Sequence, residues 1–277
     1  MPTNKHIIGN YVLRSLLDQG IHKLRQSQEF EEWLRAGRPI PPPQLVKQRT
    51  VKAYARHFRP HVFIETGTYL GDMIDAVWGM FDEVYSIELG QHLFWQAKRR
   101  FAGKQHITIL HGDSAHLLPI VLEHANKPCL FWLDAHWSGG ITVKGTTNTP
   151  IEKELYHILR HHVRDHVILV DDAHCFTGQD GYPTLQELRD LVGSTSAYAS
   201  FQVRNDIIAV TKNQIPSETP VCSETPDLLV FEALRHAYHA TCLPSAAMSL
   251  LRSRRSEEQL KATTSRTFRR RLGSPPT

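Results

Sequence analysis

The residues best suited to chemistry lie in one short stretch, Glu65–Gly71, which reads Glu-Thr-Gly-Thr-Tyr-Leu-Gly. An apolar run from Val62 ends in the Glu65 carboxylate, a loop with two glycines follows, and a helix-like segment comes next. In an α/β protein this order is a strand, a tight turn and a helix N-terminus, where nucleotide-like ligands bind. The spacing differs from the Gly-x-Gly-x-x-Gly of pyrophosphate binders and from phosphate loops. We therefore expect a ligand with no phosphate at this turn; a plain turn with a surface glutamate is the alternative.

Two further carboxylates follow the next two predicted strands. Glu88 comes at about the interval expected for an acidic residue that binds ribose hydroxyls. Asp113 follows the third strand, where it can accept a hydrogen bond from an exocyclic amine such as that of adenine. The alternatives are a solvated Glu88 and a helix N-cap at Asp113. Three strand-end carboxylates in succession indicate a binding site more specifically than any one of them.

Acidic residues and histidines also follow the fourth and fifth predicted strands. Asp134 and His136 follow the fourth, and Asp171, Asp172 and His174 follow the fifth. Because neighbouring parallel strands end at one edge of a sheet, we expect these side chains to surround one small volume. Clustered carboxylates need protons or a cation to offset their repulsion, and oxygen ligands suit Mg²⁺ or Mn²⁺. Metal ligands are therefore expected at Asp134, Asp171 and Asp172; an Asp that caps a turn is the alternative.

The elements that position these residues alternate between strand and helix patterns. Near-continuous apolar runs predict strands at Val62–Glu65, Glu83–Glu88, Ile107–His111, Leu130–Asp134 and Val167–Asp171. Helical patterns lie at Leu70–Phe81, Gln91–Phe101, Ala115–His124, Pro150–His162 and Thr184–Val192. Such alternation predicts a doubly wound parallel sheet with helices on both faces. Two short strands, Phe201–Val203 and Ile207–Val210, flank Asn205-Asp206 and predict an antiparallel hairpin at the sheet edge.

The two ends of the chain read differently from its middle. Residues 1–50 are predicted to be a helical extension, with a helix over Asn10–Leu34 followed by a run of prolines. A second helix is predicted over Leu45–Phe58 and crosses the boundary at residue 50. Residues 51–212 are predicted to form the main domain. Residues 213–277 are predicted to be a linker, a helix candidate at Leu228–Tyr238 and a basic disordered tail.

Composition narrows the class of protein. The net charge is +4, but much of the positive charge lies after Leu250, so a nucleic-acid-binding surface on the fold is not indicated. A solvated tail is the interpretation we favour over a tail that binds nucleic acid or an anionic membrane. The first ten residues lack the apolar core of a signal peptide, and no apolar run approaches the roughly 20 residues of a membrane helix. We expect a soluble, cytoplasmic protein; no oligomeric state is indicated.

With these motifs the chain resembles a class I S-adenosylmethionine-dependent methyltransferase, most of all the metal-assisted O-methyltransferases of sugars and small molecules. The resemblance rests on Glu65–Gly71, on Glu88 and on His111–Ser114, and it spans residues 51–212. It implies a Rossmann-like sheet of seven strands, mostly parallel, with an antiparallel last strand. It also accounts for the missing phosphate loop, because this cofactor carries a sulfonium and an amino acid instead. The cofactor contacts that it implies come from Glu65, Thr66, Gly67, Thr68, Tyr69, Gly71, Glu88, Asp113, Ser114 and Asp134.

The resemblance also implies a reaction. The end of the fourth strand would lie beside the methyl group being transferred, so Asp134 and His136 are the predicted catalytic residues. The acceptor would be a hydroxyl of a small molecule or saccharide. Either a metal would lower the pKa of that hydroxyl or a histidine would take its proton, and His136 is the predicted base. His174 is a second candidate base, and Asp134 has an alternative role, orienting the cofactor's amino group. The metal match is looser, because His136 stands where some relatives have another acidic residue.

Two other classes of protein compete with an enzyme of this kind. One is a non-catalytic module on the same fold that binds S-adenosylmethionine or a partner. The other is a nucleotide-sugar or dinucleotide enzyme, which the absence of Gly-x-Gly-x-x-Gly disfavours. The segment Trp137–Thr149 has the length and composition of a lid on the substrate side, with an ordinary surface loop as the alternative. The resemblance also implies that the upstream helices, over Asn10–Phe58, would cover the cofactor.

Overall fold

The computed structural model describes residues 25–135, 149–195 and 197–213. By its internal contacts the chain divides into two compact units, Met1–Ser223 and Glu224–Thr277, and all described residues belong to the first. Predictions for His136, for most of the lid segment and for everything after residue 213 lie outside the described residues. No helix among the described residues has both the length and the apolar character needed to cross a membrane. The predicted division at residues 50 and 212 stays a prediction, although residue 50 lies inside a helix.

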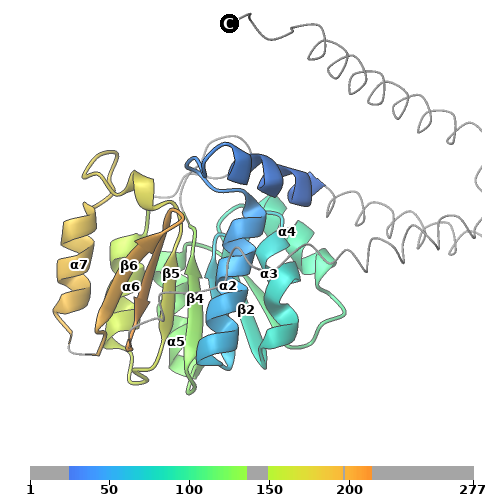
Figure 1. The fold of residues 1–277 in the computed structure, drawn as a ribbon. Helices are drawn as coiled ribbons and strands as arrows, with labels where there is room; N and C mark the ends of the chain where they lie inside the picture. The colour runs from blue at the N-terminus through green and yellow to red at the C-terminus, as the bar shows by residue number, and fades with distance from the viewer. Residues whose placement is uncertain (1–24, 136–148, 196, 214–277) are drawn as a thin grey trace, which may run out of the picture. The chain divides into compact units, whose positions relative to one another are not determined.

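A seven-stranded sheet in the order β3-β2-β1-β4-β5-β7-β6 runs through the fold (Figure 1). The strands are β1 (Val62–Thr66), β2 (Glu83–Glu88), β3 (Ile107–His111), β4 (Cys129–Leu133), β5 (Val167–Val170), β6 (Ser200–Arg204) and β7 (Ile207–Thr211). Strands β1 to β5 pair in parallel, whereas β7 is antiparallel to both β5 and β6. The mostly parallel sheet with its antiparallel last strand confirms the fold class that the sequence predicted.

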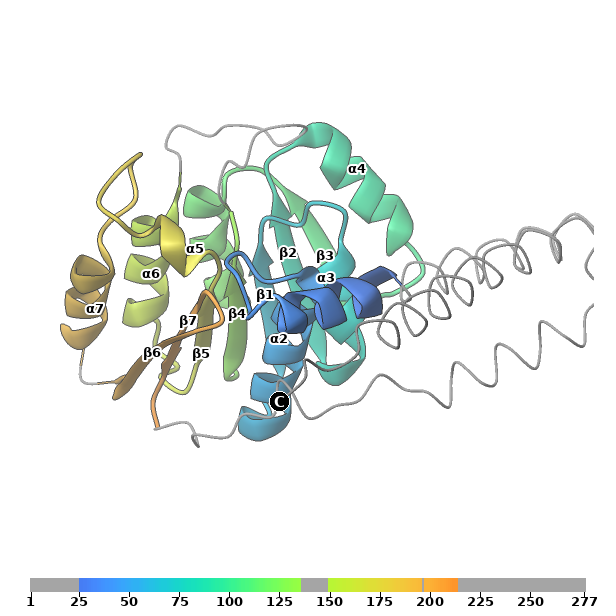
Figure 2. The same cartoon turned by 45° about the horizontal axis from the view of Figure 1, so that its top comes forward.

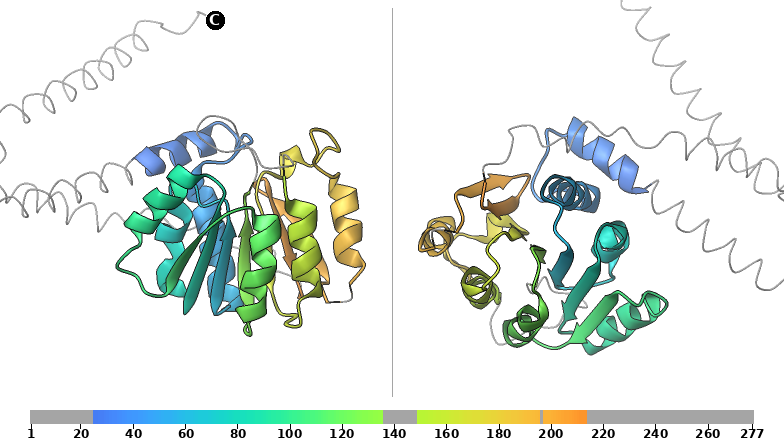
Figure 3. Two further views of the ribbon diagram at one scale, coloured as in Figure 1. Left: turned by 180° about the vertical axis from the view of Figure 1, so that it is seen from behind. Right: turned by 90° about the horizontal axis from the view of Figure 1, so that it is seen from below.

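Helices cover both faces of this sheet (Figure 3). They are α2 (Gln44–Phe58), α3 (Asp72–Val77), α4 (Gln91–Arg100), α5 (Ser114–His124), α6 (Ile151–Arg160) and α7 (Leu185–Gly193), with short 3₁₀ turns η1 (Trp78–Met80) and η2 (Ala173–Cys175). Helices α5, α6 and α7 share one core with the sheet, and α2, α3 and α4 share the other. Along β1, Val62 and Ile64 face the first core and Phe63 faces the second, as the alternation of a strand requires.

The helix predicted at Leu70–Phe81 is shorter in the structure, and that prediction is wrong at both ends. Tyr69 and Gly71 have φ angles of 49° and 82°, so the chain is left-handed there and the helix begins only at Asp72. At its other end α3 gives way at Trp78 to the 3₁₀ turn η1. The glycine turn therefore extends two residues further than expected, and Leu70 belongs to it.

The predicted hairpin is confirmed and has a two-residue turn. Asn205 and Asp206 both have positive φ angles, 49° and 63°, and the flanking Arg204 and Ile207 are paired. Two left-handed residues match the right-handed twist of hairpin strands, and Asn and Asp tolerate this conformation better than most residues. The turn carries Asp206 to the carboxyl end of β5, where the Asp206 backbone carbonyl accepts a hydrogen bond from the Ala173 amide at 2.8 Å.

Candidate functional site

The candidate site lies where the loops after β1, β2, β4 and β5 leave the carboxyl edge of the sheet (Figure 2). Backbone hydrogen bonds continue the strand ladders into these loops. The Asp134 amide donates to Thr66 at 3.0 Å, and the Asp171 amide donates to Leu133 at 3.0 Å. Each strand-end aspartate is therefore fixed by its neighbouring strand, and the two loops are held side by side.

Gly67 is the residue that lets the turn after β1 lie against the end of β4. Its φ is +86°, and a Cβ atom built on it would lie 2.5 Å from the carbonyl oxygen of Asp134. Any side chain there would collide with backbone that cannot easily move. The turn after β1 thus lies directly against the loop after β4, the one predicted to hold the catalytic residues.

Glu88 ties the same turn to β2. Its Oε2 accepts a hydrogen bond from the amide of Tyr69 at 2.8 Å, and its Oε1 accepts one from the amide of Gly90 at 2.7 Å. Glu88 is buried, and burial raises its pKa, while the hydrogen bonds from these amides act in the opposite direction. The alternative of a solvated strand-end glutamate is wrong, because this carboxylate is an internal acceptor at the base of the glycine turn.

Glu65 lies deeper than a ligand-facing residue was expected to lie. It is buried, its Oε2 accepts a hydrogen bond from the Ser86 hydroxyl at 2.6 Å, and that hydroxyl is 2.6 Å from the hydroxyl of Thr68. Burial raises the pKa of Glu65 well above its ordinary value, the Ser86 hydrogen bond opposes this, and nearby Asp134 adds to it. In the described residues Glu65 supports the turn from inside, and direct contact with a ligand stays a prediction.

Asp113 caps helix α5, as the alternative for this residue proposed. Its Oδ1 accepts a hydrogen bond from the Ala115 amide at 2.9 Å, and its Oδ2 lies 3.7 Å from the ring of His116. An N-cap role occupies one carboxylate oxygen and leaves the adenine contact a prediction. The following Ser114 is buried.

Glu154 is a buried acid of this region that sequence reasoning did not select. It comes from α6 and is 1% exposed. Burial raises its pKa to about 7, and the nearby Asp113 and Asp134 add to the rise. Glu154 Oε1 and Thr66 Oγ1 have no hydrogen-bond partner among the described residues. The signal in the sequence was a carboxylate between Ile151 and Ile158, on the apolar face of a helix.

Three carboxylates meet at the ends of β4 and β5. Asp134, Asp171 and Asp172 each offer an oxygen, and these oxygens lie within 4.8 Å of one another. Lys47, from the first turn of α2, places its ammonium nitrogen 2.5 Å from Asp171 Oδ2 and 3.2 Å from Asp172 Oδ1. The structure thus brings together the three predicted metal ligands and adds a cation that the sequence analysis missed.

The cluster has a counter-charge within the protein. Burial and the neighbouring Asp134 raise the pKa of Asp171, and Lys47 opposes that rise. Burial disfavours the charged form of Lys47, but Asp171, Asp134 and Asp172 together raise the pKa of its ammonium above its ordinary value. Lys47 is therefore protonated at neutral pH, and the cluster carries its own counter-charge.

The cluster was expected to take Mg²⁺ or Mn²⁺, and its donor set alone suits such an ion. In the structure, however, both oxygens of Asp171 have partners, because Lys47 contacts Oδ2 and the Asp172 amide donates to Oδ1 at 2.9 Å. Asp172 Oδ1 also faces the Lys47 ammonium. With Lys47 in this position, the three carboxylates do not fit a divalent ion in addition to the ammonium.

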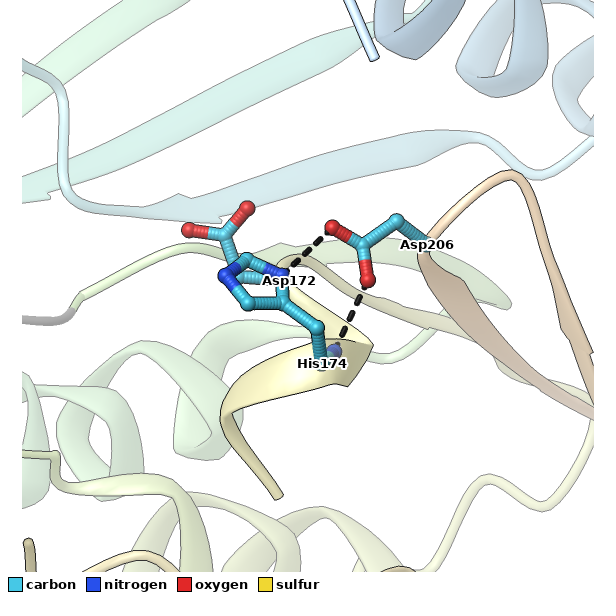
Figure 4. Close-up of side chains that lie close together, drawn as sticks. All are labelled: Asp172, His174 and Asp206. Carbon is cyan, nitrogen blue, oxygen red and sulfur yellow. Dashed lines mark hydrogen bonds and ion pairs between the residues drawn. The ribbon is translucent and has the colours of Figure 1, made fainter. Parts of the chain in front are cut away.

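A histidine and an aspartate form a second group beside Asp172 (Figure 4). His174 Nδ1 lies 2.6 Å from Asp206 Oδ2, and the His174 amide donates to Asp206 Oδ1 at 2.8 Å. Two contacts from one buried carboxylate fix both the backbone and the ring, and they favour the tautomer with the proton on Nδ1. Because the His174 side chain is 42% exposed, its ring remains accessible.

Comparison with known proteins gives likeness in structure alone. No protein-family model and no curated protein sequence matches the chain. One similar structure is the Streptomyces achromogenes O-methyltransferase TomG, in complex with SAM, at 14% identity and TM-score 0.45, covering 68% of this chain and 89% of that one. A Bacillus cereus O-methyltransferase in complex with SAH is similar at 15% identity and TM-score 0.45, covering 67% and 91%. The SAH-bound Podospora anserina methyltransferase PaMTH1 is similar at 13% and 0.44, covering 77% and 98%.

Proposed function

We propose that this chain is a class I S-adenosylmethionine-dependent methyltransferase that transfers a methyl group to a hydroxyl of a small molecule or saccharide. The observation that carries the proposal is Glu88, a buried carboxylate at the end of β2 whose oxygens hold the amides of Tyr69 and Gly90. It lies under a glycine turn that lacks the spacing of a pyrophosphate site. A carboxylate in this position of a Rossmann-like sheet is suited to ribose hydroxyls.

The residues around this turn fit such a cofactor. Gly67 has no room for a side chain, and Thr66 has a buried hydroxyl with no partner in the described part of the chain. We assign Glu88 to the ribose, Asp113 and Ser114 to the adenine, and Asp134 to the amino group. The half-exposed Tyr69 is free to stack on a ring. Glu65, Thr68 and Gly71 are assigned to shaping the turn.

When bound, the cofactor supplies an electrophilic methyl group on its sulfonium. The protein's residues then have to orient the acceptor and remove its proton while the acceptor oxygen bonds to the methyl carbon and the carbon–sulfur electron pair stays with sulfur. His136 is the predicted base. His174 is a second candidate, because Asp206 holds its Nδ1 and thereby leaves Nε2 as the basic nitrogen. The arrangement follows the general form of a base whose ring is oriented by a carboxylate.

Metal assistance through Asp134, Asp171 and Asp172 stays a prediction of the sequence. It is supported by the donor set and opposed by the position of Lys47. We also propose that the protein is soluble and that its acceptor is a small molecule or a saccharide. A non-catalytic module that binds S-adenosylmethionine remains the competing function. The accessible His174 ring, oriented by Asp206 and lying beside Asp172, argues against it, since a module that only binds has no need of an oriented base.

A methyl-transfer screen tests the proposal. The full chain is incubated with S-adenosylmethionine labelled on its methyl group and with sugars, phenols, small acids and amines, once with Mg²⁺ and once with a chelator. We expect label in a hydroxyl-bearing acceptor. Label in amines alone would contradict hydroxyl transfer. Thermal unfolding is measured beside the screen, with S-adenosylhomocysteine and with NAD. Stabilisation by S-adenosylhomocysteine without transfer to any class of acceptor would favour the non-catalytic module, and stabilisation by NAD alone would favour a dinucleotide enzyme.

A further inference from the structure

We infer that Lys47 is the resident cation of the carboxylate cluster formed by Asp134, Asp171 and Asp172, in the place that a divalent metal would take. Its ammonium contacts two of these three residues, at 2.5 Å and 3.2 Å. The inference deepens the proposed function, because it names the positive charge at that site. The assignment of Lys47 as the cation rests on the geometry of the cluster alone, so it does not depend on which reaction the protein catalyses.

Lys47 is positioned by the fold and is not a chance surface partner. It lies between Val46 and Gln48, both buried. Val46 packs with Phe30 and Trp33, and the Gln48 side-chain amide donates to the backbone carbonyl of Asp72 at 3.1 Å. On one side of Lys47 the chain is thus packed on Phe30 and Trp33, and on the other side it is hydrogen-bonded to the start of α3. The backbone that carries the Lys47 side chain is therefore fixed.

The pair with Asp171 is interior. The Lys47 side chain is 13% exposed and that of Asp171 is 0% exposed. Exposed ion pairs contribute little because water and salt screen them, but a buried carboxylate that loses its partner is left as an uncompensated charge. The helical spacing explains why this charge lies inside. Lys47, Val51 and Tyr54 recur at the spacing of one helix face, and Val51 and Tyr54 are in the core.

Lys47 and a divalent ion compete for the same oxygens. Mg²⁺ requires oxygens at about 2.0–2.1 Å in a near-octahedral shell, and Mn²⁺ prefers the same kind of ligand. Asp171 Oδ2 and Asp172 Oδ1 already face the ammonium, and Asp171 Oδ1 accepts the Asp172 amide. A metal would have to displace Lys47 and would then lie beside its positive charge.

Removal of the Lys47 charge should convert the cluster into a metal site. Without the ammonium, Asp171 and Asp172 would lie beside Asp134 without the positive charge of Lys47, and repulsion between carboxylates is relieved by protons or by a cation. A divalent ion then gains oxygens that the wild-type protein keeps occupied. Lys47→Met keeps the length and helix propensity of the side chain and removes only the charge.

Electron paramagnetic resonance of Mn²⁺ with the full-length protein tests this inference. Bound Mn²⁺ is measured as loss of the free-ion spectrum for wild type, Lys47→Met, Lys47→Arg and Asp171→Asn. The control is Lys98→Met, which removes the same charge from the exposed face of α4. We expect Lys47→Met to bind Mn²⁺ about tenfold more tightly than wild type, or better, while Lys47→Arg and Lys98→Met behave as wild type.

Mn²⁺ binding by wild type that Asp171→Asn abolishes would overturn the inference, and so would a folded Lys47→Met protein with no gain in Mn²⁺ affinity. If circular dichroism shows that Lys47→Met does not fold, the comparison of wild type with Asp171→Asn decides alone, and equal absence of binding supports the inference. Methyl transfer, once an acceptor is found, should be insensitive to chelator. Failure to find any acceptor would count against the proposed function and leave the Mn²⁺ result standing.

Discussion

Glu88 combines two tasks in one carboxylate. Its two oxygens hold the amides of Tyr69 and Gly90, so it fixes the glycine turn, and it keeps lone pairs for ligand hydroxyls. Glu88→Gln keeps the shape of the side chain but replaces one acceptor oxygen by a donor that faces an amide donor. We expect affinity for S-adenosylhomocysteine to fall about tenfold or more, which is about 1.4 kcal/mol.

Isothermal titration calorimetry of the Glu88→Gln variant measures that loss. Glu83→Gln, at the opposite end of β2, is the matched control, because its partner is the Tyr85 hydroxyl and it lies away from the turn. Equal affinities of wild type and Glu88→Gln would remove Glu88 from the cofactor site.

The two histidine candidates for the base can be separated by substitution. If His174 takes the proton, His174→Gln should lower kcat about 100-fold or more with little change in cofactor affinity. Asp206→Asn, which no longer favours the Nδ1 proton, should lower kcat and change the pH profile. If His136 is the base, His136→Asn has these effects and the His174 variant retains its turnover. Retained turnover in both single variants would contradict a histidine base.

The turn after β1 is the element on which the site depends most. Gly67→Ala would place a Cβ atom 2.5 Å from the Asp134 carbonyl oxygen and force alanine into a φ of +86°. The left-handed conformation alone costs about 1–2 kcal/mol, and the steric clash adds to this. We expect a lower thermal midpoint and loss of S-adenosylhomocysteine binding.

Gly103→Ala is the control for that substitution, because a Cβ atom there meets nothing within 4 Å and its φ is not left-handed. Thermal unfolding with and without S-adenosylhomocysteine compares the two variants. If Gly67→Ala matched Gly103→Ala in both measurements, the close contact between the β1 turn and the β4 loop would be unimportant for binding.

Much of the fold was predictable because an apolar run in the sequence indicates a buried strand. Every predicted strand agrees with the structure to within one residue at each end. The helix at Leu70–Phe81 was overestimated, because hydrophobic spacing cannot register the left-handed backbone at Tyr69. Strand-end carboxylates were predictable for the same reason as the strands, since each one terminates an apolar run.

The residues that the sequence did not reveal are those whose partners lie far along the chain. Lys47 precedes Asp171 by 124 residues, and a lysine in an amphipathic helix normally indicates a solvated face. Glu154 lies in the first turn of α6, where an acid is favourable on a helix surface, but the structure buries it against the loops after β1 and β3. Tertiary packing, which no local pattern encodes, decides both.

At the scale of the whole molecule, a buried histidine pair links stability to pH. His161 Nε2 lies 2.9 Å from the Leu122 carbonyl, His161 Nδ1 lies 2.9 Å from His166 Nε2, and His166 Nδ1 accepts the Cys129 amide. This chain is complete when both rings are neutral, each with its proton on Nε2. Burial lowers the pKa of His161, and burial together with His161 lowers the pKa of His166 to about 3.

Because the folded pKa of His166 lies below its unfolded value of about 6.5, the unfolded state binds more protons at acid pH. Stability is therefore full above pH about 6.5 and falls as the pH decreases toward 3. At pH 5 one such group lowers the free energy of unfolding by about 2 kcal/mol. Urea unfolding at pH 7.5 and pH 5 should show that the free energy of unfolding falls by about this much more in wild type than in His166→Asn.

His92→Asn, on the exposed face of α4, should leave the pH dependence of wild type unchanged. Titrating groups common to all three proteins cancel in this comparison. Equal losses of stability in wild type and His166→Asn between the two pH values would show that the histidine pair is not the source of the acid sensitivity.

The central claim is that the edge of the sheet between β1 and β2 holds S-adenosylmethionine, and calorimetric titration of the full chain with S-adenosylhomocysteine tests it most directly. We predict binding of one ligand per chain, abolished by Gly67→Ala and retained in Gly103→Ala, with no heat of binding from NAD. Binding of NAD in place of S-adenosylhomocysteine, or binding that Gly67→Ala leaves intact, would contradict the claim.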